Sequence, residues 1–141
     1  MSDFEQILNL ISRVGFSFDE GDLTSFLGCW ADDGVLNFVS ADMKTVLDSV
    51  PRQEMEKKLG GAMAGYPHKH FVSLPVVDID GDEAIARYFT LYPAAASEPA
   101  VPGVSQSHMV IRRQADGRWK LYRHNLGNIS RTRTDVAYQP R

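Results

Sequence analysis

Apolar residues recur at helical spacing near the start of the chain. Between Phe4 and Phe18 they fall three or four positions apart, which predicts an amphipathic helix with one buried face. Ser2 and Glu5 have the spacing of a capping box, a device that starts a helix. Gly21 follows the last apolar residue and is expected to end this helix.

A second, shorter helix, a strand and a third helix are predicted next. Asp22 can cap the second helix, whose apolar residues again have helical spacing: Leu23, Phe26, Leu27 and Trp30. Residues 31–34 are expected to form a turn and residues 35–39 a strand. Pro51 suits the first position of a third helix, which carries Met55, Leu59 and Met63.

From residue 70 onward the pattern changes to the alternation typical of an antiparallel sheet. Residues 71–79 and 84–92 flank Asp80-Gly81-Asp82, and residues 105–113 and 119–124 flank Ala115-Asp116-Gly117. These two segments predict two hairpins. Residues 93–103, rich in Ala and Pro, are expected to form a loop at the rim of the sheet that can act as a lid. The polar tail at residues 126–141 is expected to be partly disordered.

Composition excludes several classes of function. The chain has 141 residues, of which 43% are hydrophobic, and this suits a single domain over residues 1–141 with its own core. A net charge of −3 gives no basic surface for nucleic acid, so a small-molecule partner is expected. Cys29 is the only cysteine, which excludes an intrachain disulfide. No apolar run is long enough to span a membrane, and we expect a cytoplasmic protein.

Asp19 is the residue whose position is hardest to explain as solvated surface. It lies eleven positions after Leu8, which brings it to within about 20° of that residue on a helical wheel. A carboxylate beside the buried stripe must be paired or hydrogen-bonded, because burying it alone costs several kcal/mol. The candidate partner is His70, which opens the apolar run that ends at Leu74. The alternative is a helix-end carboxylate that caps the next helix or pairs with an arginine.

Several short motifs, taken in order, resemble one known family. They are Phe18-Asp19-Glu20-Gly21-Asp22-Leu23, His70-Phe71, Asp80-Gly81-Asp82-Glu83-Ala84 and Asp116-Gly117-Arg118-Trp119-Lys120-Leu121. Their succession resembles the SnoaL-like branch of the nuclear transport factor 2-like superfamily, to which scytalone dehydratase and polyketide cyclases are similar. The resemblance implies an α+β fold: a cone-shaped barrel in which three N-terminal helices close a curved, mostly antiparallel sheet around a pocket. It also implies a homo-oligomer, a dimer or a trimer.

The resemblance implies a catalytic pair as well. Asp19 matches the family's aspartate on the first helix, and His70 matches the histidine with which it pairs. Phe18 falls where the scytalone dehydratase pattern has a tyrosine, and His108 falls where it has an asparagine. What remains is a general mechanism in which neutral His70, held by Asp19, takes a proton from a carbon next to an activating group. No cofactor is required.

Further residues are candidates for the pocket. His108 is either a second acid or base in the cavity or a residue that covers a sheet edge. Of Arg123 and His124, which alternate on the last strand, we expect Arg123 to point inward. The proposed substrate-binding residues are Phe18, Trp30, Phe38, Met63, Tyr88, Tyr92, Val110 and Arg123.

Two functional classes stay open at the level of the sequence. The first is a lyase or isomerase, dehydratase-like or cyclase-like, that acts on a small hydrophobic, cyclic or polyketide-like molecule. The second is a non-catalytic module of the same fold for ligand binding or oligomerisation. A metal site is not predicted: His68 and His70 have the spacing of ligands on one strand, but residues 71–77 contain no acid to complete the set.

Overall fold

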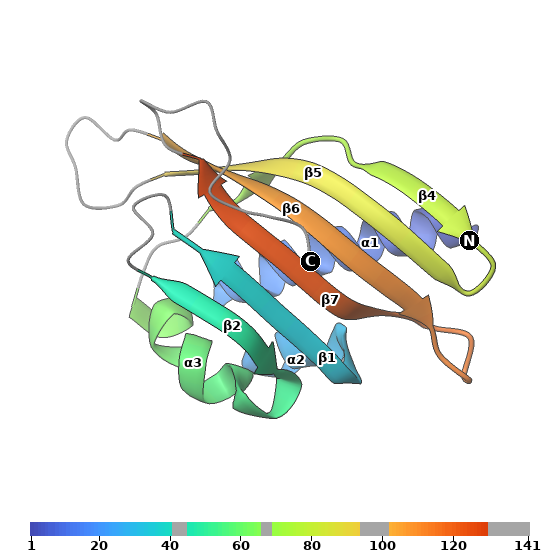
Figure 1. Cartoon of the computed structure of the whole chain (residues 1–141), viewed down its shortest axis with the longest axis horizontal. Helices are drawn as coiled ribbons and strands as arrows, with labels where there is room; N and C mark the ends of the chain where they lie inside the picture. The colour runs from blue at the N-terminus through green and yellow to red at the C-terminus, as the bar shows by residue number, and fades with distance from the viewer. Residues whose placement is uncertain (41–44, 66–68, 94–101, 130–141) are drawn as a thin grey trace.

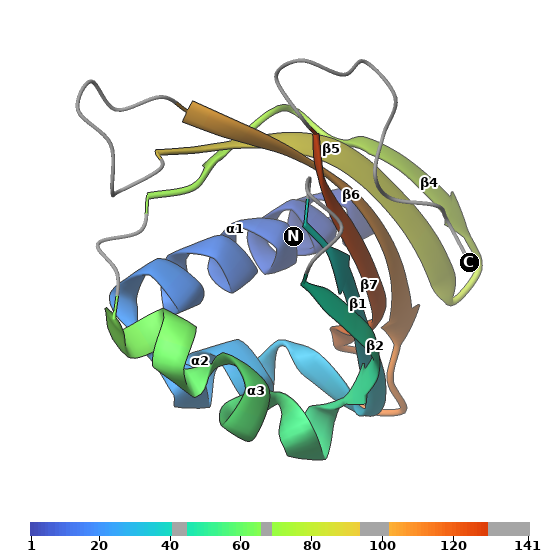
Figure 2. The same cartoon turned by 60° about the vertical axis from the view of Figure 1, so that its left-hand side comes forward.

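A curved seven-stranded sheet and three helices make up the part of the chain that the computed structural model describes, residues 1–40, 45–65, 69–93 and 102–129. The sheet bends around the first helix, and all three helices lie on its concave side (Figures 1 and 2). This is the α+β cone that the sequence led us to expect. Within the described residues, no helix is long and apolar enough to cross a membrane.

The helices begin and end largely where local sequence predicts. Helix α1 spans Asp3–Glu20, α2 spans Leu23–Gly28 and α3 spans Arg52–Gly65. Both halves of the capping box between Ser2 and Glu5 are formed, and Asp22 accepts a hydrogen bond from the backbone N–H of Ser25. Gly21 ends α1 in the left-handed conformation, at φ 69°, where a residue without a Cβ avoids strain.

The strands follow the order β2-β1-β7-β6-β5-β3, with β4 paired to β5 as well. Strands β1 and β7 are parallel, and the other pairs are antiparallel. The hairpins β4–β5 and β6–β7 lie where they were predicted. The strand bounds are β1 Trp30–Val39, β2 Val46–Pro51, β3 Phe71–Val72, β4 Val76–Asp80, β5 Glu83–Pro93, β6 Pro102–Arg113 and β7 Trp119–Ile129.

The structure corrects the prediction of a turn at residues 31–34. Trp30 starts β1 instead of ending α2, and the strand continues through this segment with an irregular register between Trp30 and Val35. Neighbouring atoms approach the backbone closely at Gly34, which explains the glycine there. A Cβ on Gly34 would lie 2.9 Å from the Trp30 ring and 3.1 Å from the carbonyl oxygen of Leu121. The segment is therefore an irregularity within a strand rather than a connection.

Other boundaries were also wrong. Strand β2 was missed, and Pro51 is its last residue, so α3 begins one residue later than expected. The single strand predicted for residues 71–79 is two strands, β3 and β4. Strand β7 extends through residues 126–129, where a disordered tail had been expected. Most of the expected lid, residues 94–101, and the rest of the tail, residues 130–141, lie outside the described residues.

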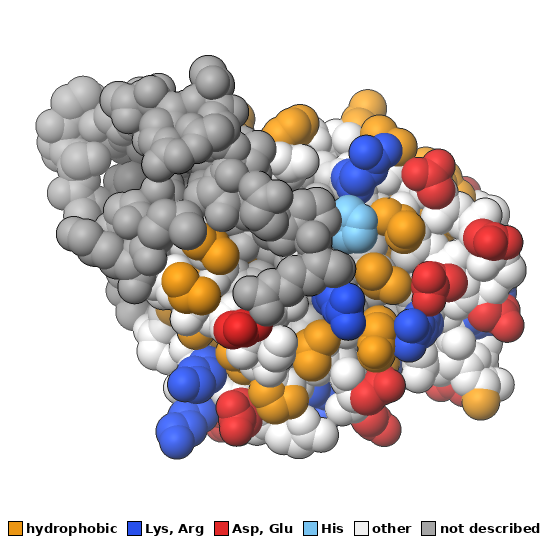
Figure 3. Space-filling model, in the orientation of Figure 1, with side chains coloured by type: hydrophobic (Ala, Val, Ile, Leu, Met, Phe, Trp, Pro, Cys, Tyr) orange, Lys and Arg blue, Asp and Glu red, His pale blue; other side chains and the backbone are white. Residues whose placement is uncertain are grey.

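The two sides of the sheet differ in burial. On the concave side Met109, Ile111 and Leu121 are completely buried against the helices. On the outer side Phe71, Phe89 and Leu91 are about half exposed or more, and we call these three residues the outer patch. Apolar and charged side chains are mixed across the outer side of the sheet (Figure 3). The concave face of the sheet thus contributes to the core, whereas the outer face keeps apolar side chains in solvent.

Candidate active site

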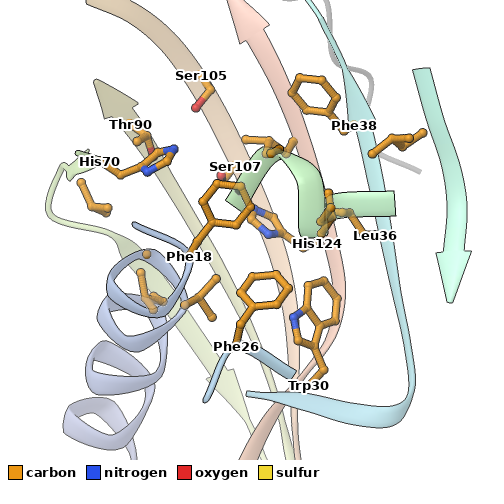
Figure 4. Close-up of a pocket in the computed structure, with 18 of the residues that line it drawn as sticks. Phe18, Phe26, Trp30, Leu36, Phe38, His70, Thr90, Ser105, Ser107 and His124 are labelled. Atoms are coloured by element: carbon orange, nitrogen blue, oxygen red, sulfur yellow. Dashed lines mark hydrogen bonds between the residues drawn. The ribbon is translucent and has the colours of Figure 1, made fainter. Parts of the chain in front are cut away.

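A cavity of about 410 Å³ lies between the concave face of the sheet and the helices (Figure 4). This volume is within the usual range for small-molecule pockets. Most of its wall is apolar. The lining residues come from all three helices and from most strands: Ile11, Val14, Gly15, Phe18, Phe26, Trp30, Leu36, Phe38, Thr45, Leu47, Lys58, Leu59, Ala62, His70, Val72, Tyr88, Thr90, Ser105, Ser107, His124 and Leu126.

Asp19 and His70 meet beside this cavity, in the arrangement predicted from the sequence. One carboxylate oxygen, Oδ2, accepts a hydrogen bond of 2.8 Å from the backbone N–H of His70. The other, Oδ1, is hydrogen-bonded to Nδ1 of the His70 ring. The Asp19 side chain is 8% exposed, whereas that of His70 is 26% exposed and lines the cavity. The carboxylate therefore lies behind the imidazole, and the imidazole faces the cavity.

This contact determines which ring nitrogen of His70 can act as a base. An ionised carboxylate only accepts hydrogen bonds, so the neutral imidazole carries its proton on Nδ1. Nε2 is then the nitrogen with the lone pair. The ring of Phe18 packs edge-on against His70, with centroids 5.7 Å apart and planes at 87°. The carboxylate and Phe18 together restrict the orientation of the ring.

A second polar group, His124, lies deeper in the same cavity. It is 7% exposed, and its Nε2 is 3.0 Å from the hydroxyl oxygen of Ser107, which is 1% exposed. Burial, and to a smaller extent the charge of nearby His108, lowers the pKa of His124 to about 3. Burial also raises the pKa of the neighbouring Tyr88 phenol, and a hydrogen bond with Ser107 offsets only part of that effect. His124 and Tyr88 are therefore both neutral at physiological pH.

Aromatic rings join the two histidines along one wall of the cavity. Ring centroids are 5.9 Å apart between Phe18 and Phe26 and 6.0 Å apart between Phe26 and Trp30. Trp30 in turn lies 6.3 Å from the ring of His124, at an angle of 35°. In Figure 4 the ring of Phe18 lies between His70 and His124, and the rings of Phe26 and Trp30 lie next to it on the side of His124. The cavity thus has two polar positions separated by an aromatic wall.

Four of the predicted substrate-binding residues line the cavity: Phe18, Trp30, Phe38 and Tyr88. Met63 does not; it is 5% exposed and belongs to the core, because helix α3 presents Lys58, Leu59 and Ala62 to the cavity instead. The side chain of Tyr92 lies outside the described part of the structure.

His108 and Val110 were wrongly assigned to the pocket. Alternate residues of β6 face the core, and these are the odd-numbered ones, from Ser105 and Ser107 to Met109 and Ile111. His108 and Val110 therefore lie on the outer face of the sheet. The sequence itself indicated this orientation. Gln106, His108 and Arg112 are separated by even numbers of residues and so point to the same face of a strand, and polar Gln106 and Arg112 mark that face as the outer one.

Arg123 was also wrongly assigned, and here a β-bulge is the cause. Leu121 is paired with Ile111 and Arg123 with Val110, so Tyr122 is an extra residue in β7. The bulge exchanges the two faces beyond that point. His124 consequently points into the cavity, whereas Arg123 lies on the outer face beside the Tyr122 ring. Strict alternation from Trp119 and Leu121 would have placed Arg123 inside.

The described residues contain no cluster of three or more His, Cys, Asp and Glu side chains suited to a metal ion. His68, one half of the pair considered from the sequence, lies outside the described residues.

Comparisons with known proteins agree with this architecture. Residues 1–125 match the model of the SnoaL-like domain family. A comparison with curated protein sequences gives no match. Rv3472, a protein of unknown function from Mycobacterium tuberculosis, has a similar structure with a TM-score of 0.75 and 20% identity, over 89% of this chain and 71% of that one.

Two further solved structures are similar. A candidate dehydratase of the nuclear transport factor 2-like family from Streptomyces avermitilis is 24% identical, with a TM-score of 0.67 over 88% of this chain and 94% of that one. A protein from Catenulispora acidiphila, solved in complex with S-DNPA, is 19% identical, with a TM-score of 0.72 over 89% of this chain and 92% of that one. At these identities the likeness establishes the fold.

Proposed function

Since this chain belongs to the SnoaL-like domain family, we propose that it is a cofactor-independent lyase or isomerase in which Asp19 and His70 transfer a proton. The observation that carries the proposal is the double contact of Asp19, which holds both the backbone N–H and the ring Nδ1 of His70. A histidine held in this way beside an apolar cavity is suited to general acid and base catalysis. The similar fold of a candidate dehydratase supports the same direction.

The proposed reaction begins at a carbon next to a carbonyl group of the substrate. Nε2 of His70 takes the proton, and the C–H electron pair forms the double bond of an enolate. The Asp19 carboxylate stabilises the imidazolium that results. In an elimination, a hydroxyl group on the β-carbon then leaves, takes the proton from Nε2 and departs as water. In an isomerisation, Nε2 returns the proton to another carbon of the conjugated system.

The substrate class follows from the wall of the cavity. The rings of Phe18, Phe26 and Trp30 offer apolar faces and edges, and an unsaturated or aromatic ring packs well against such surfaces. A small cyclic ketone, such as a polyketide-like intermediate, combines this shape with an acidified C–H group. We therefore propose a hydrophobic, cyclic, carbonyl-containing substrate.

The experiment is a screen of cyclic β-hydroxy ketones and β,γ-unsaturated ketones, since both reactions yield conjugated enones with strong ultraviolet absorbance. His70→Ala is expected to abolish turnover, and Asp19→Asn to lower kcat by about 100-fold or more, because the amide neither orients the ring nor balances its charge. His108→Gln, on the outer face, is the matched control and should keep wild-type turnover. Wild-type turnover in His70→Ala would overturn the proposal.

We also propose that the protein is a homo-oligomer joined through the outer patch of Phe71, Phe89 and Leu91. Exposed apolar side chains grouped on adjacent strands are typical of surfaces that another subunit covers.

A further inference from the structure

His124 has no part in the reaction proposed above, although it lies in the same cavity. Its side chain is more than nine-tenths buried. Nε2 is satisfied by the hydroxyl of Ser107 at 3.0 Å. Nδ1, in contrast, makes no hydrogen bond to any other residue that the structure describes. Since His124 lines the cavity, a ligand there can supply the hydrogen bond that Nδ1 lacks within the described residues.

Hydroxyl side chains on β5 and β6 add further polar groups to the cavity wall near His124. Two cross-strand pairs, Tyr88 with Ser107 and Thr90 with Ser105, lie on the inner faces of β5 and β6. All four side chains line the cavity and are at least nine-tenths buried. Their hydroxyl groups donate or accept hydrogen bonds as the partner requires. The floor of the cavity is therefore polar but uncharged.

We propose that His124, supported by Ser107, is a hydrogen-bonding subsite that binds a hydroxyl or carbonyl oxygen of the ligand and so orients the ligand toward His70. It is a positioning and specificity-determining residue. Orientation of the ligand toward His70 rests on the proposed function. Binding of the ligand oxygen by His124 does not depend on it.

The chemistry of the subsite defines what it accepts. A neutral imidazole carries one ring proton, so Nδ1 offers an N–H if Nε2 accepts from the Ser107 hydroxyl and a lone pair if Nε2 donates to it. A ligand hydroxyl group can pair with Nδ1 in either state. A carbonyl oxygen can pair with Nδ1 only when Nδ1 carries the proton. A carboxylate or ammonium group would lose its hydration without gaining an opposite charge, so the subsite disfavours ionised ligands.

The aromatic wall then sets the shape of the ligand between the two polar positions. Phe18, Phe26 and Trp30 connect His70 to His124 through successive ring contacts of about 6 Å. A flat ring system with an oxygen substituent at one end fits this arrangement, because its faces contact the rings while its oxygen reaches His124. The ligand class is therefore a neutral phenol or cyclic ketone.

The test compares two probes of nearly equal size, 2-naphthol and 2-methylnaphthalene, which differ in a hydroxyl and a methyl group. Affinities are measured by quenching of tryptophan fluorescence in the wild-type protein, in His124→Phe and in His108→Phe. In His124→Phe the preference for 2-naphthol over 2-methylnaphthalene is expected to fall by about fivefold to tenfold, the value of one hydrogen bond. His108→Phe, which changes a histidine on the outer face of the same sheet, should leave the preference unchanged.

A second measurement needs no substitution. In ¹⁵N NMR spectra of the wild type, the Nδ1 signal of His124 should shift when 2-naphthol is added and should shift much less with 2-methylnaphthalene. A purely structural histidine would show the same response to both probes.

The test of the His124 subsite can be distinguished from the test of the proposed reaction. His70→Gln removes the base but should keep the preference for 2-naphthol, so loss of turnover with an intact preference supports the subsite alone. An unchanged preference in His124→Phe, a missing Nδ1 shift, or a wild type that fails to bind 2-naphthol would each overturn the inference.

Discussion

The charge state of His124 links its burial to the stability of the protein. Burial lowers its pKa to about 3, whereas a histidine in an unfolded chain has a pKa of about 6.5. Below pH 6.5 the unfolded state takes up a proton that the folded state does not. The stability from this residue is therefore complete above pH 6.5 and is lost as pH falls from 6.5 toward 3.

This relation predicts a pH effect that is specific to one residue. Between pH 7 and pH 5 the wild type should lose about 2 kcal/mol of unfolding free energy through His124, at about 1.4 kcal/mol per pH unit. His124→Phe keeps the ring volume and removes the titrating group, so its loss over the same interval should be smaller by that amount. Urea denaturation at both pH values measures the difference. Equal losses in the two proteins would contradict the burial of a neutral His124.

At the scale of single elements, backbone irregularities decide where the strands direct their side chains. The sequence predicted the helix boundaries at Ser2, Gly21 and Asp22 because each depends on a local hydrogen bond or on one backbone conformation. It predicted the contact of Asp19 with His70 from helical position and family resemblance together. Such local signals carry most of the information about the helices.

The rest depended on long-range contacts that no local pattern encodes. The bulge at Tyr122 exists only through the pairing of β7 with β6, yet it exchanges the positions of Arg123 and His124. The irregular segment at residues 31–34 likewise depends on packing against Leu121, a residue far away in the sequence. His124 and most of the polar residues around it were therefore missed, although the pocket itself and Tyr88 in its wall were predicted.

The irregular segment of β1 yields a prediction for Gly34. A Cβ at this position would meet two backbone carbonyl oxygens, of Ala31 at 3.0 Å and of Leu121 at 3.1 Å, and backbone atoms adjust at a higher cost than flexible side chains. Gly34→Ala should lower the free energy of unfolding by about 1–3 kcal/mol. Gly28→Ala is the control, because nothing lies within 4 Å of its added methyl group. Equal denaturation midpoints for the two variants would show that β1 lacks this close approach.

At the scale of the whole molecule, the two faces of the sheet have different roles. The concave face carries the cavity and its polar groups, and the outer face carries the outer patch. Phe71 is paired with Leu91 across β3 and β5, so their side chains point to the same side. The alternation of β5 places Phe89 on that side too, while Thr90 faces the cavity. One strand thus contributes to the pocket and to a surface suited to association.

The outer patch predicts a concentration-dependent assembly. Phe89→Glu places a charge within the outer patch and should shift the protein toward the monomer in sedimentation velocity experiments, because a buried, unpaired carboxylate is costly. Phe16→Glu changes an exposed phenylalanine on helix α1 and should leave the assembly unchanged. A wild type that sediments as a monomer at micromolar concentration would contradict the prediction.

The central claim is that Asp19 and His70 move a proton on a bound carbon acid, and elimination and isomerisation share that first step. The most direct measurement is therefore the incorporation of deuterium from D₂O into a panel of cyclic ketones, followed by NMR or mass spectrometry. The account predicts exchange at the α-carbon in the wild type, its loss in His70→Gln and its retention in His108→Gln. Exchange at the wild-type rate in His70→Gln would contradict it.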